Sequence, residues 1–440
     1  MNPRPPIQIQ PVAPAPRPAK GPVVLPPDAR IWRAQRLLWA PHRLGFFAAA
    51  CVMAAAALWW AFELLWRVLP MPALHHASIA TFSHALVMSL GFLPLFFVGF
   101  LFTAGPKWLH MPEVPAPILV KPVVACVLGW LGLLVGTHLG QPLAAAGVAL
   151  AATGWSVLSG RFAWLVHRSL VADRLHATLI AVSCGLGAVL MWVAALSLLF
   201  DQIEWVRMCA YLGLWWFVVP VYTAVAHRMI PFFTAAAVPV LDGWRPYWLL
   251  WSLLTLAWWH GACVVLDTFG WSQNDATLLT RAAVSAVAGT GVLALAVRWG
   301  LVQSLKIRLL AMLHVGFVWL GVAYGLDAVS ACLQVAGHVG LGLAPLHALS
   351  MGFLGSILLA MATRVSCGHS GRTLTADDLA WALYGVLQLA VLARMAAAVW
   401  PQYGAGILVV AATLWVVATG GWAWRYGRWY GLPRVDGKAG

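Results

Sequence analysis

Apolar residues run through this chain in twelve long blocks, which are separated by short stretches rich in proline, glycine and charged residues. A block of about 18 or more residues with few charges is long enough to cross a bilayer as a helix. The pattern therefore predicts an all-α, polytopic membrane protein. The predicted spans are residues 44–68, 79–104, 118–138, 143–159, 176–200, 205–227, 246–267, 277–298, 308–330, 342–363, 378–400 and 405–425.

The same pattern divides the chain into three parts. Residues 1–43 are rich in proline and lack an apolar core, so we predict a disordered cytoplasmic tail. They contain no apolar stretch of the kind found in a cleaved signal peptide, so the first span is expected to direct insertion. Residues 44–426 form the predicted transmembrane domain, and residues 427–440 form a second cytoplasmic tail.

The positive charges predict the orientation of the spans. Of the 27 lysines and arginines, 23 fall on one side when twelve spans alternate, and this side includes both termini. Only Arg67, Arg207, Arg281 and Arg394 fall on the other side. Because cytoplasmic loops carry the excess of lysine and arginine, both termini are predicted to be cytoplasmic. For a bacterial protein, this topology indicates the inner membrane.

Composition supports this interpretation and excludes others. The chain is 62% hydrophobic and 9% charged, whereas a soluble protein carries about a quarter charged residues. The net charge of +14 lies in short loops between spans, which argues against nucleic-acid binding. No Walker A motif is present, which argues against an ATP-driven pump. The seven cysteines form no C-x-x-C pair, so any haem would be held without covalent attachment.

Three histidines are predicted to share one layer near the outer face. His84 lies about five residues into the second span, and His347 lies at the same depth in the tenth span, which runs in the same direction. The strings "HALVMSLGF" and "HALSMGF" begin at these two residues. His260 reaches a similar depth from the seventh span. Histidines inside a bilayer can serve as hydrogen-bond partners between helices, or they can bind a metal ion or haem.

A second group of polar residues is predicted near the inner face. "HRMIPFFT" ends the sixth span with Arg228, and "TRVSCGHSGRT" ends the tenth span with Arg364, His369 and Arg372. Arginine at these positions could bind carboxylates such as haem propionates. The alternative is a helix end whose cations complement the helix dipole. His314, early in the ninth span, lies toward the same face.

Four segments resemble the NnrS family of twelve-helix inner-membrane proteins. They are "SHALVMSLGF…VGFLFTAGPKW", "HRMIPFFT", "LLAMLHVGFVWLG" and "HALSMGFLGSILLAMATRVSCGHSGRTL", in this order along the chain. The resemblance implies haem b, copper and a role in denitrification and the nitric oxide response. The residues that match family motif positions are His84, His314, His347, His369, Arg228, Pro231, Phe232, Phe233, Arg364 and Arg372.

The chain departs from the family pattern beside His84. The family commonly has a second histidine and a glutamate shortly after the first histidine, where this chain has Leu86 and Val87. Ser83 replaces a tryptophan. Because an imidazole and a carboxylate are missing, the resemblance supports haem at this position better than copper.

The sequence leaves several functions open. The first is a haem-containing membrane protein that binds or processes nitric oxide and relieves nitrosative stress. The second is a transporter for a small solute or a metal, whose histidines line the path. The third is a factor that delivers haem or copper to another enzyme. The residues do not distinguish turnover from sensing, so the chain is not assigned as an enzyme.

Overall fold

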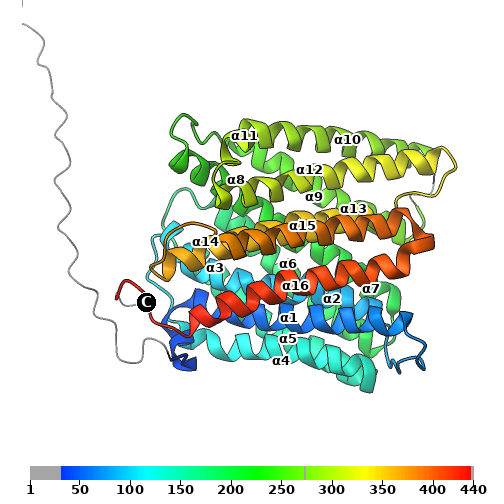
Figure 1. Ribbon diagram of the computed structural model, residues 1–440, viewed down its shortest axis with the longest axis horizontal. Helices are drawn as coiled ribbons and strands as arrows, with labels where there is room; N and C mark the ends of the chain where they lie inside the picture. The colour runs from blue at the N-terminus through cyan, green and yellow to red at the C-terminus, as the bar shows by residue number, and fades with distance from the viewer. Residues whose placement is uncertain (1–30, 272–273, 438–440) are drawn as a thin grey trace, which may run out of the picture.

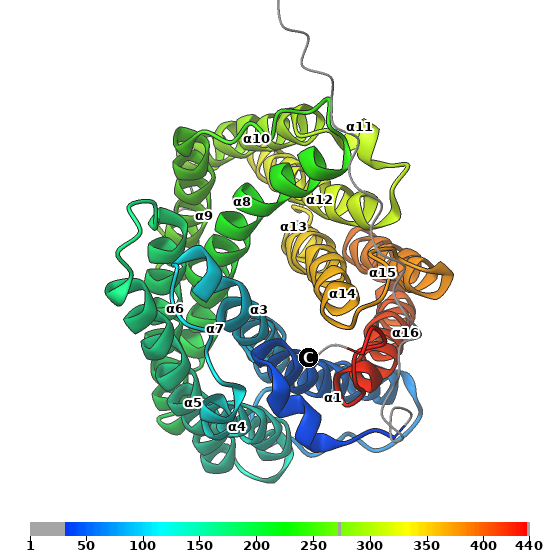
Figure 2. The ribbon, with the colours of Figure 1, turned by 90° about the vertical axis from the view of Figure 1, so that its left-hand side faces the viewer.

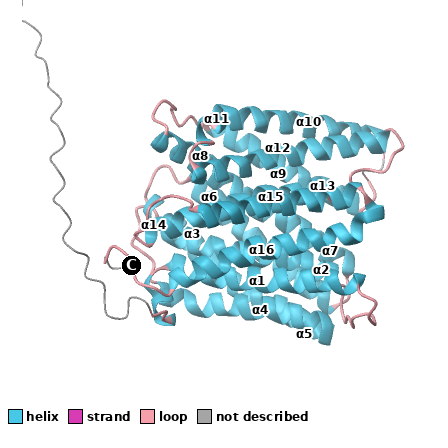
Figure 3. Ribbon diagram, viewed as in Figure 1, coloured by secondary structure: helices cyan, strands magenta, loops and turns pink. Residues whose placement is uncertain are grey.

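The computed structural model describes residues 31–271 and 274–437. Within these ranges the secondary structure is entirely helical (Figure 3). In these described ranges, twelve helical runs are long and apolar enough to cross a membrane, which confirms the predicted fold class. Residues 1–30 and 438–440, which belong to the two predicted tails, lie outside the described residues.

Each span consists of one helix or of several consecutive helical segments (Figure 1). Spans 1 to 6 are α1 (Pro41–Val68); α2 (Ala80–Leu86), η2 (Val87–Gly91) and α3 (Phe92–Trp108); η3 (Ala116–Leu119) and α4 (Val120–Leu139); α5 (Gln141–Arg168); α6 (Leu175–Leu199); and α7 (Ile203–Leu212), η4 (Gly213–Val218) and α8 (Val219–Ala237). Spans 7 to 12 are α9 (Tyr247–Thr268); α10 (Asp275–Arg298); α12 (Arg308–Val335); α13 (Ala344–His347), η5 (Ala348–Gly355) and α14 (Ser356–His369); α15 (Asp378–Val399); and η6 (Pro401–Tyr403) and α16 (Gly404–Tyr430). The short helices η1 (Ala34–Trp39) and α11 (Leu301–Ser304) lie outside the spans.

The spans begin and end close to the predicted residues, with three differences. The sixth span continues to Ala237, ten residues beyond the predicted end at residue 227, so "HRMIPFFT" lies inside α8 and does not end the span. Helix α5 continues to Arg168, well beyond the predicted end at residue 159, because long cationic side chains can extend from the end of a span toward water. The folded region also begins before residue 44. Helix η1 precedes α1, and Arg43 donates hydrogen bonds to the carbonyl oxygens of Tyr430 (3.0 Å) and Leu432 (2.7 Å). Residues 34–43 therefore pack against the C-terminal helix.

Three spans occupy the interior of the bundle. Viewed end-on, α3, α8 and α14 stand inside a ring formed by the other long helices (Figure 2). Spans 2, 6 and 10, to which they belong, bury 78%, 83% and 72% of their most apolar stretches, against 28–67% for the other nine spans. The motifs singled out in the sequence lie mainly on these three spans, which explains why their polar residues can face protein rather than lipid.

Each interior span contains a π-helical segment, namely η2, η4 and η5. A π-helix has i→i+5 hydrogen bonds, is rare, and is found frequently at functional sites. His84 lies three residues before η2, and His347 lies directly before η5. The two similar strings "HALVMSLGF" and "HALSMGF" thus share an irregular backbone as well as sequence.

Glycine allows a close approach of backbones between an interior helix and the ring. A Cβ atom added at Gly45 of α1 would lie 2.4 Å from the backbone nitrogen of Gly99 in α3. Small residues at such crossings let membrane helices pack backbone against backbone. The crossing holds the first and second spans together near the end where α1 begins.

Two faces of the bundle are used below as reference. The termini face is the one where α1 begins at Pro41 and α16 ends at Tyr430 (Figure 1). The far face is the opposite one, where α1 ends at Val68. That the termini face is cytoplasmic stays a prediction.

Candidate functional site: two polar layers

The structure places both His84 and His347 near the far face. They lie on spans 2 and 10, which run in the same direction, and they are close enough to interact electrostatically. Both also interact with Arg394 of α15. Both imidazoles are half-buried. The two similar strings thus lie at the same end of the bundle, as their shared depth predicted.

The surroundings of each ring indicate which nitrogen is available as a ligand. The Nδ1 atom of His347 lies 2.9 Å from the carbonyl oxygen of Leu343, which can only accept, so Nδ1 carries the proton. In the neutral ring, Nε2 then carries the lone pair, as in a metal-bound histidine oriented by a backbone carbonyl. His84 stacks on Trp60 with ring centroids 3.9 Å apart. Its Nδ1 atom is buried and has no hydrogen-bond partner among the described residues.

His260, the third histidine predicted for this layer, lies in a separate polar network. Its Nδ1 atom donates to the carbonyl oxygen of Leu256 (2.8 Å), and its Nε2 atom lies 3.3 Å from Ser285 Oγ and 3.6 Å from Asp327 Oδ2. Asp327 also accepts two hydrogen bonds from Arg281. Through these polar contacts, His260 connects α9 with α10 and α12.

The three predicted arginines near the termini face lie over aromatic rings. Arg364 Cζ lies 3.9 Å from the ring centroid of Phe233, which belongs to the "HRMIPFFT" motif. Arg228 lies over Trp108 (4.9 Å). Among the described residues, no ion pair to a carboxylate involves these two arginines or Arg372. Guanidinium groups that stack on aromatic rings keep their N–H donors free for an anionic ligand.

Arg372 and His369 belong to the same face but contact different partners. Arg372 Cζ lies 4.0 Å from the ring centroid of Trp429. Its Nη1 atom is buried and has no hydrogen-bond partner within the described part of the chain, and burial lowers the pKa of this guanidinium. His369 packs against His42, with ring centroids 4.3 Å apart. Sequence reasoning missed His42 because it lies in the residues assigned to the N-terminal tail.

The turn after α14 needs glycine. Gly371 has φ +74°, and a Cβ atom there would lie 2.6 Å from Cγ of Asp436. Asp436 pairs with Arg434 (2.6 Å), and this hydrogen bond raises the pKa of Arg434. Arg434 also donates to the carbonyl oxygen of His369 (3.1 Å). The C-terminal segment therefore holds the turn that carries the end of the tenth-span motif.

Two further buried histidine groups lie toward the termini face. Thr234 donates to the carbonyl oxygen of Ile230 (2.9 Å), so its oxygen accepts from His314 Nε2 (2.9 Å) and His314 Nδ1 carries the lone pair. Nδ1 of His314 is buried without a hydrogen-bond partner among the described residues. His176 Nε2 lies 3.0 Å from His227 Nδ1. His314 is therefore placed on the predicted side, and it faces α8.

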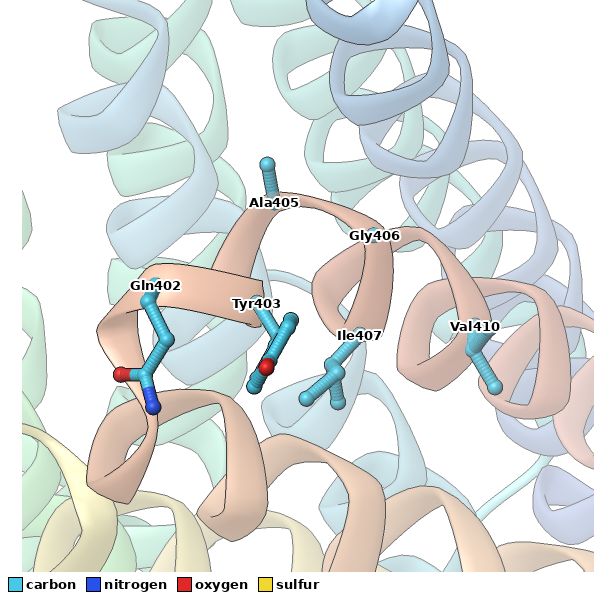
Figure 4. A pocket seen from close by; sticks show the side chains of 6 residues that line it. All are labelled: Gln402, Tyr403, Ala405, Gly406, Ile407 and Val410. Carbon is cyan, nitrogen blue, oxygen red and sulfur yellow. The ribbon is translucent and has the colours of Figure 1, made fainter.

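A small apolar cavity lies between the interior spans. Its volume is about 50 Å³, and it is lined by aromatic and aliphatic residues of α1, α3, α8 and α14, among them Phe96, Tyr222 and Met361. The Tyr222 hydroxyl is buried without a hydrogen-bond partner among the described residues. A larger hollow on the surface of α16, around Gln402 and Ile407, presents one amide and one phenol and no titratable acid or imidazole (Figure 4).

A third polar group lies at the far face and was not predicted as a site. Glu63, His76 and His138 place one ligand atom each within 4.8 Å of one another. Glu63 falls within the first predicted span, at residues 44–68, whereas His76 and His138 carry no motif. They are brought to Glu63 by the loop after α1 and by the end of α4.

These features define a polytopic membrane protein whose interior spans carry histidines near the far face and arginines near the termini face. The chain belongs to the NnrS family, because the sequence profile of this family, described as "NnrS protein", matches residues 36–434. The match confirms the resemblance found in the sequence. No curated protein matches the chain.

Proposed function

We propose that the protein is a haem-containing membrane protein of the nitric oxide response and that His84 and His347 hold a b-type haem. Membership of the NnrS family supports a role in the nitric oxide response. The observation that carries the haem proposal is that two imidazoles from spans 2 and 10 lie near the same face, within range of electrostatic interaction, each beside a π-helical segment. When bound, the haem iron would supply the site that takes up nitric oxide.

The residues of the chain fit this role. The lone pair of His347 Nε2 is directed by the hydrogen bond from Nδ1 to Leu343, which also restrains rotation of the ring. Trp60 restrains His84 by stacking and shields it from water. The departures at Leu86 and Val87 remove donors beside His84, so the proposal includes no copper ion at this layer.

The cavity between the interior spans supports passage of a small, weakly polar molecule. About 50 Å³ exceeds the space that one water molecule needs, and the lining is almost entirely apolar. The hydroxyl of Tyr222 offers a single hydrogen-bond donor there. Nitric oxide meets both conditions, since it is small and weakly polar.

Arg364 is proposed to belong to a different anion site. It lies 17 residues after His347 on one continuous span, which corresponds to about 25 Å along a helix. That separation is too large for the propionates of a porphyrin whose iron is bound by His347. Arg228, Arg364, Arg372 and His369 therefore remain available for a separate anionic group at the termini face.

The experiment compares visible spectra of purified protein. His347→Ala and His84→Ala should each remove or shift the Soret band, because each removes an imidazole that would hold the haem, whereas membrane insertion should be unchanged. His338→Ala is the matched control, since His338 is exposed and only nine residues away from His347. A Soret band unaltered in both ligand variants would refute the site. A wild-type protein without haem after expression with adequate haem supply would refute the function.

Arg364→Lys separates the two layers. Lysine keeps the positive charge but loses the planar fork and the stacking geometry over Phe233. We expect the Soret band to stay as in the wild type and tolerance of nitric oxide in cells to fall. Unchanged tolerance would mean that the arginine serves only as a helix-end cation.

A further inference from the structure

The far face carries a compact group of metal-ligating side chains built from three segments. Glu63 lies in α1, His76 lies in the loop that follows it, and His138 lies at the end of α4. Glu63 is fully buried, His138 is half-buried and His76 is exposed. The group therefore has a buried carboxylate and an opening to the aqueous side.

The carboxylate of Glu63 is surrounded by nitrogen atoms. His76 Nε2 lies 3.1 Å from Oε1 and 3.0 Å from Oε2, and His138 Nε2 lies 3.4 Å from Oε1. Arg67 Nη2 lies farther away, 3.7 Å from Oε2, and its side chain is 46% exposed. Burial of an ionised carboxylate is costly unless a charge compensates it closely, and Arg67 provides only a distant and solvated one.

Hydrogen bonding fixes the tautomer of His138. Its Nδ1 atom donates to the carbonyl oxygen of His75 (3.1 Å), and its Nε2 atom accepts from the indole N–H of Trp59 (2.9 Å). An indole N–H can only donate, so Nε2 carries a lone pair. This lone pair and Oε1 of Glu63 are two acceptors 3.4 Å apart with no proton between them. A metal cation placed between them would accept one coordinate bond from each atom and so remove the repulsion.

The distances match those of a bound ion. Two ligands bound about 2.0–2.1 Å from a tetrahedral ion lie about 3.3–3.4 Å apart. The observed separation of His138 Nε2 and Glu63 Oε1 is 3.4 Å, so these two ligands need no rearrangement. His76 Nε2 is 3.0–3.1 Å from the same carboxylate, and its exposed position allows the small shift required. The bond from His138 Nδ1 to a carbonyl is the outer interaction that orients a metal-bound imidazole.

We propose that Glu63, His76 and His138 form a site for a divalent transition-metal ion. Two imidazole nitrogens and one carboxylate oxygen suit Zn²⁺ or Cu²⁺, with one position left open toward the aqueous side. Binding displaces the proton of His76 Nε2 and the hydrogen bond from Trp59. The site uses none of the residues proposed to hold the haem, so the metal-site proposal can be tested independently of the proposed function.

The first test measures Zn²⁺ affinity of the full-length protein in detergent after removal of metals with a chelator. Competition against a chromogenic zinc indicator should reveal one tight site. Glu63→Gln, His76→Ala and His138→Ala should each weaken binding about tenfold or more, because each removes a ligand. His75→Ala is the matched control, since it keeps the backbone carbonyl that orients His138. Cu²⁺ added to the wild type should show nitrogen hyperfine coupling from imidazole, and this coupling should weaken in His138→Ala.

A second variant distinguishes a metal site from a hydrogen-bonded cluster. Trp59→Phe removes the donor that competes for the lone pair of His138, so we expect Zn²⁺ to bind more tightly than in the wild type. A purely structural cluster would gain no affinity. The proposal is overturned if the wild type binds no stoichiometric Zn²⁺, or if the three ligand variants bind it as the wild type does. The Soret band, measured on the same samples, reports the haem site separately and should be unchanged in His76→Ala.

Discussion

Replacing Arg281 by methionine should destabilise the far-face half of the bundle, because it leaves a buried carboxylate without its main partner. Asp327 of α12 is 7% exposed and accepts from Arg281 Nε (3.1 Å) and Nη2 (2.5 Å). Ser285 Oγ donates a third hydrogen bond at 2.8 Å. The Nε2 atom of His260 lies 3.6 Å from Oδ2 of the same carboxylate.

The magnitude follows from burial and geometry. Hydrogen bonds to charged groups are worth about 1.5–3 kcal/mol each, and removal of one partner from a buried ion pair costs about 3–5 kcal/mol. Because the Arg281 side chain is 29% exposed, solvent screening lowers the expectation to about 3 kcal/mol. Replacing both partners, Arg281→Met with Asp327→Leu, should recover most of this loss, since no unpaired charge then remains buried.

The assay is the free energy of unfolding in mixed detergent micelles, with an exposed ion pair as control. Arg207 pairs with Glu204 at 2.5 Å, and their side chains are 44% and 65% exposed. Arg207→Met should therefore change the free energy of unfolding by no more than about 1 kcal/mol. If Arg281→Met costs no more than Arg207→Met, the Asp327 network does not stabilise the fold, and His260 loses the structural role assigned to it.

Two further predictions test the topology and the packing. Reporter fusions in the loop at residues 400–404 should report the outer side and those at residues 300–306 the cytoplasm; the reverse pattern would contradict the predicted orientation. Gly45→Leu should lower the yield of folded protein, because its Cβ would lie 2.4 Å from Gly99, whereas Gly185→Leu should be tolerated because nothing lies within 4 Å of a Cβ there; equal yields would refute the close crossing.

The number, order and approximate ends of the spans could be predicted from the sequence. A membrane span depends on a local run of apolar residues, and the bilayer sets its length. The ends of spans that carry arginine were harder to predict. Arg161 and Arg168 interrupted the apolar run of the fourth span, yet α5 continues past Arg161 and ends only at Arg168, because long side chains can reach water from within a helix.

The pairing of His84 with His347 was predicted only as a shared depth. Topology converts position in the chain into depth, but it does not say which spans are neighbours. The structure supplies that information by placing spans 2, 6 and 10 inside the ring. It also shows that the polar partners of His260 are Ser285 and Asp327 and not the other two histidines. The π-helical segments have no sequence signature that we could read in advance.

The cluster of Glu63, His76 and His138 could not be predicted from the sequence. Glu63 lies among apolar neighbours inside the first predicted span, and a carboxylate in a bilayer needs a compensating partner. The compensating groups come from a loop and from the end of another span, 13 residues and 75 residues further along the chain. Their approach depends on how α1 and α4 pack and on the path of the loop after α1. Only tertiary structure decides this, because ligand geometry depends on distances between segments that local pattern does not constrain.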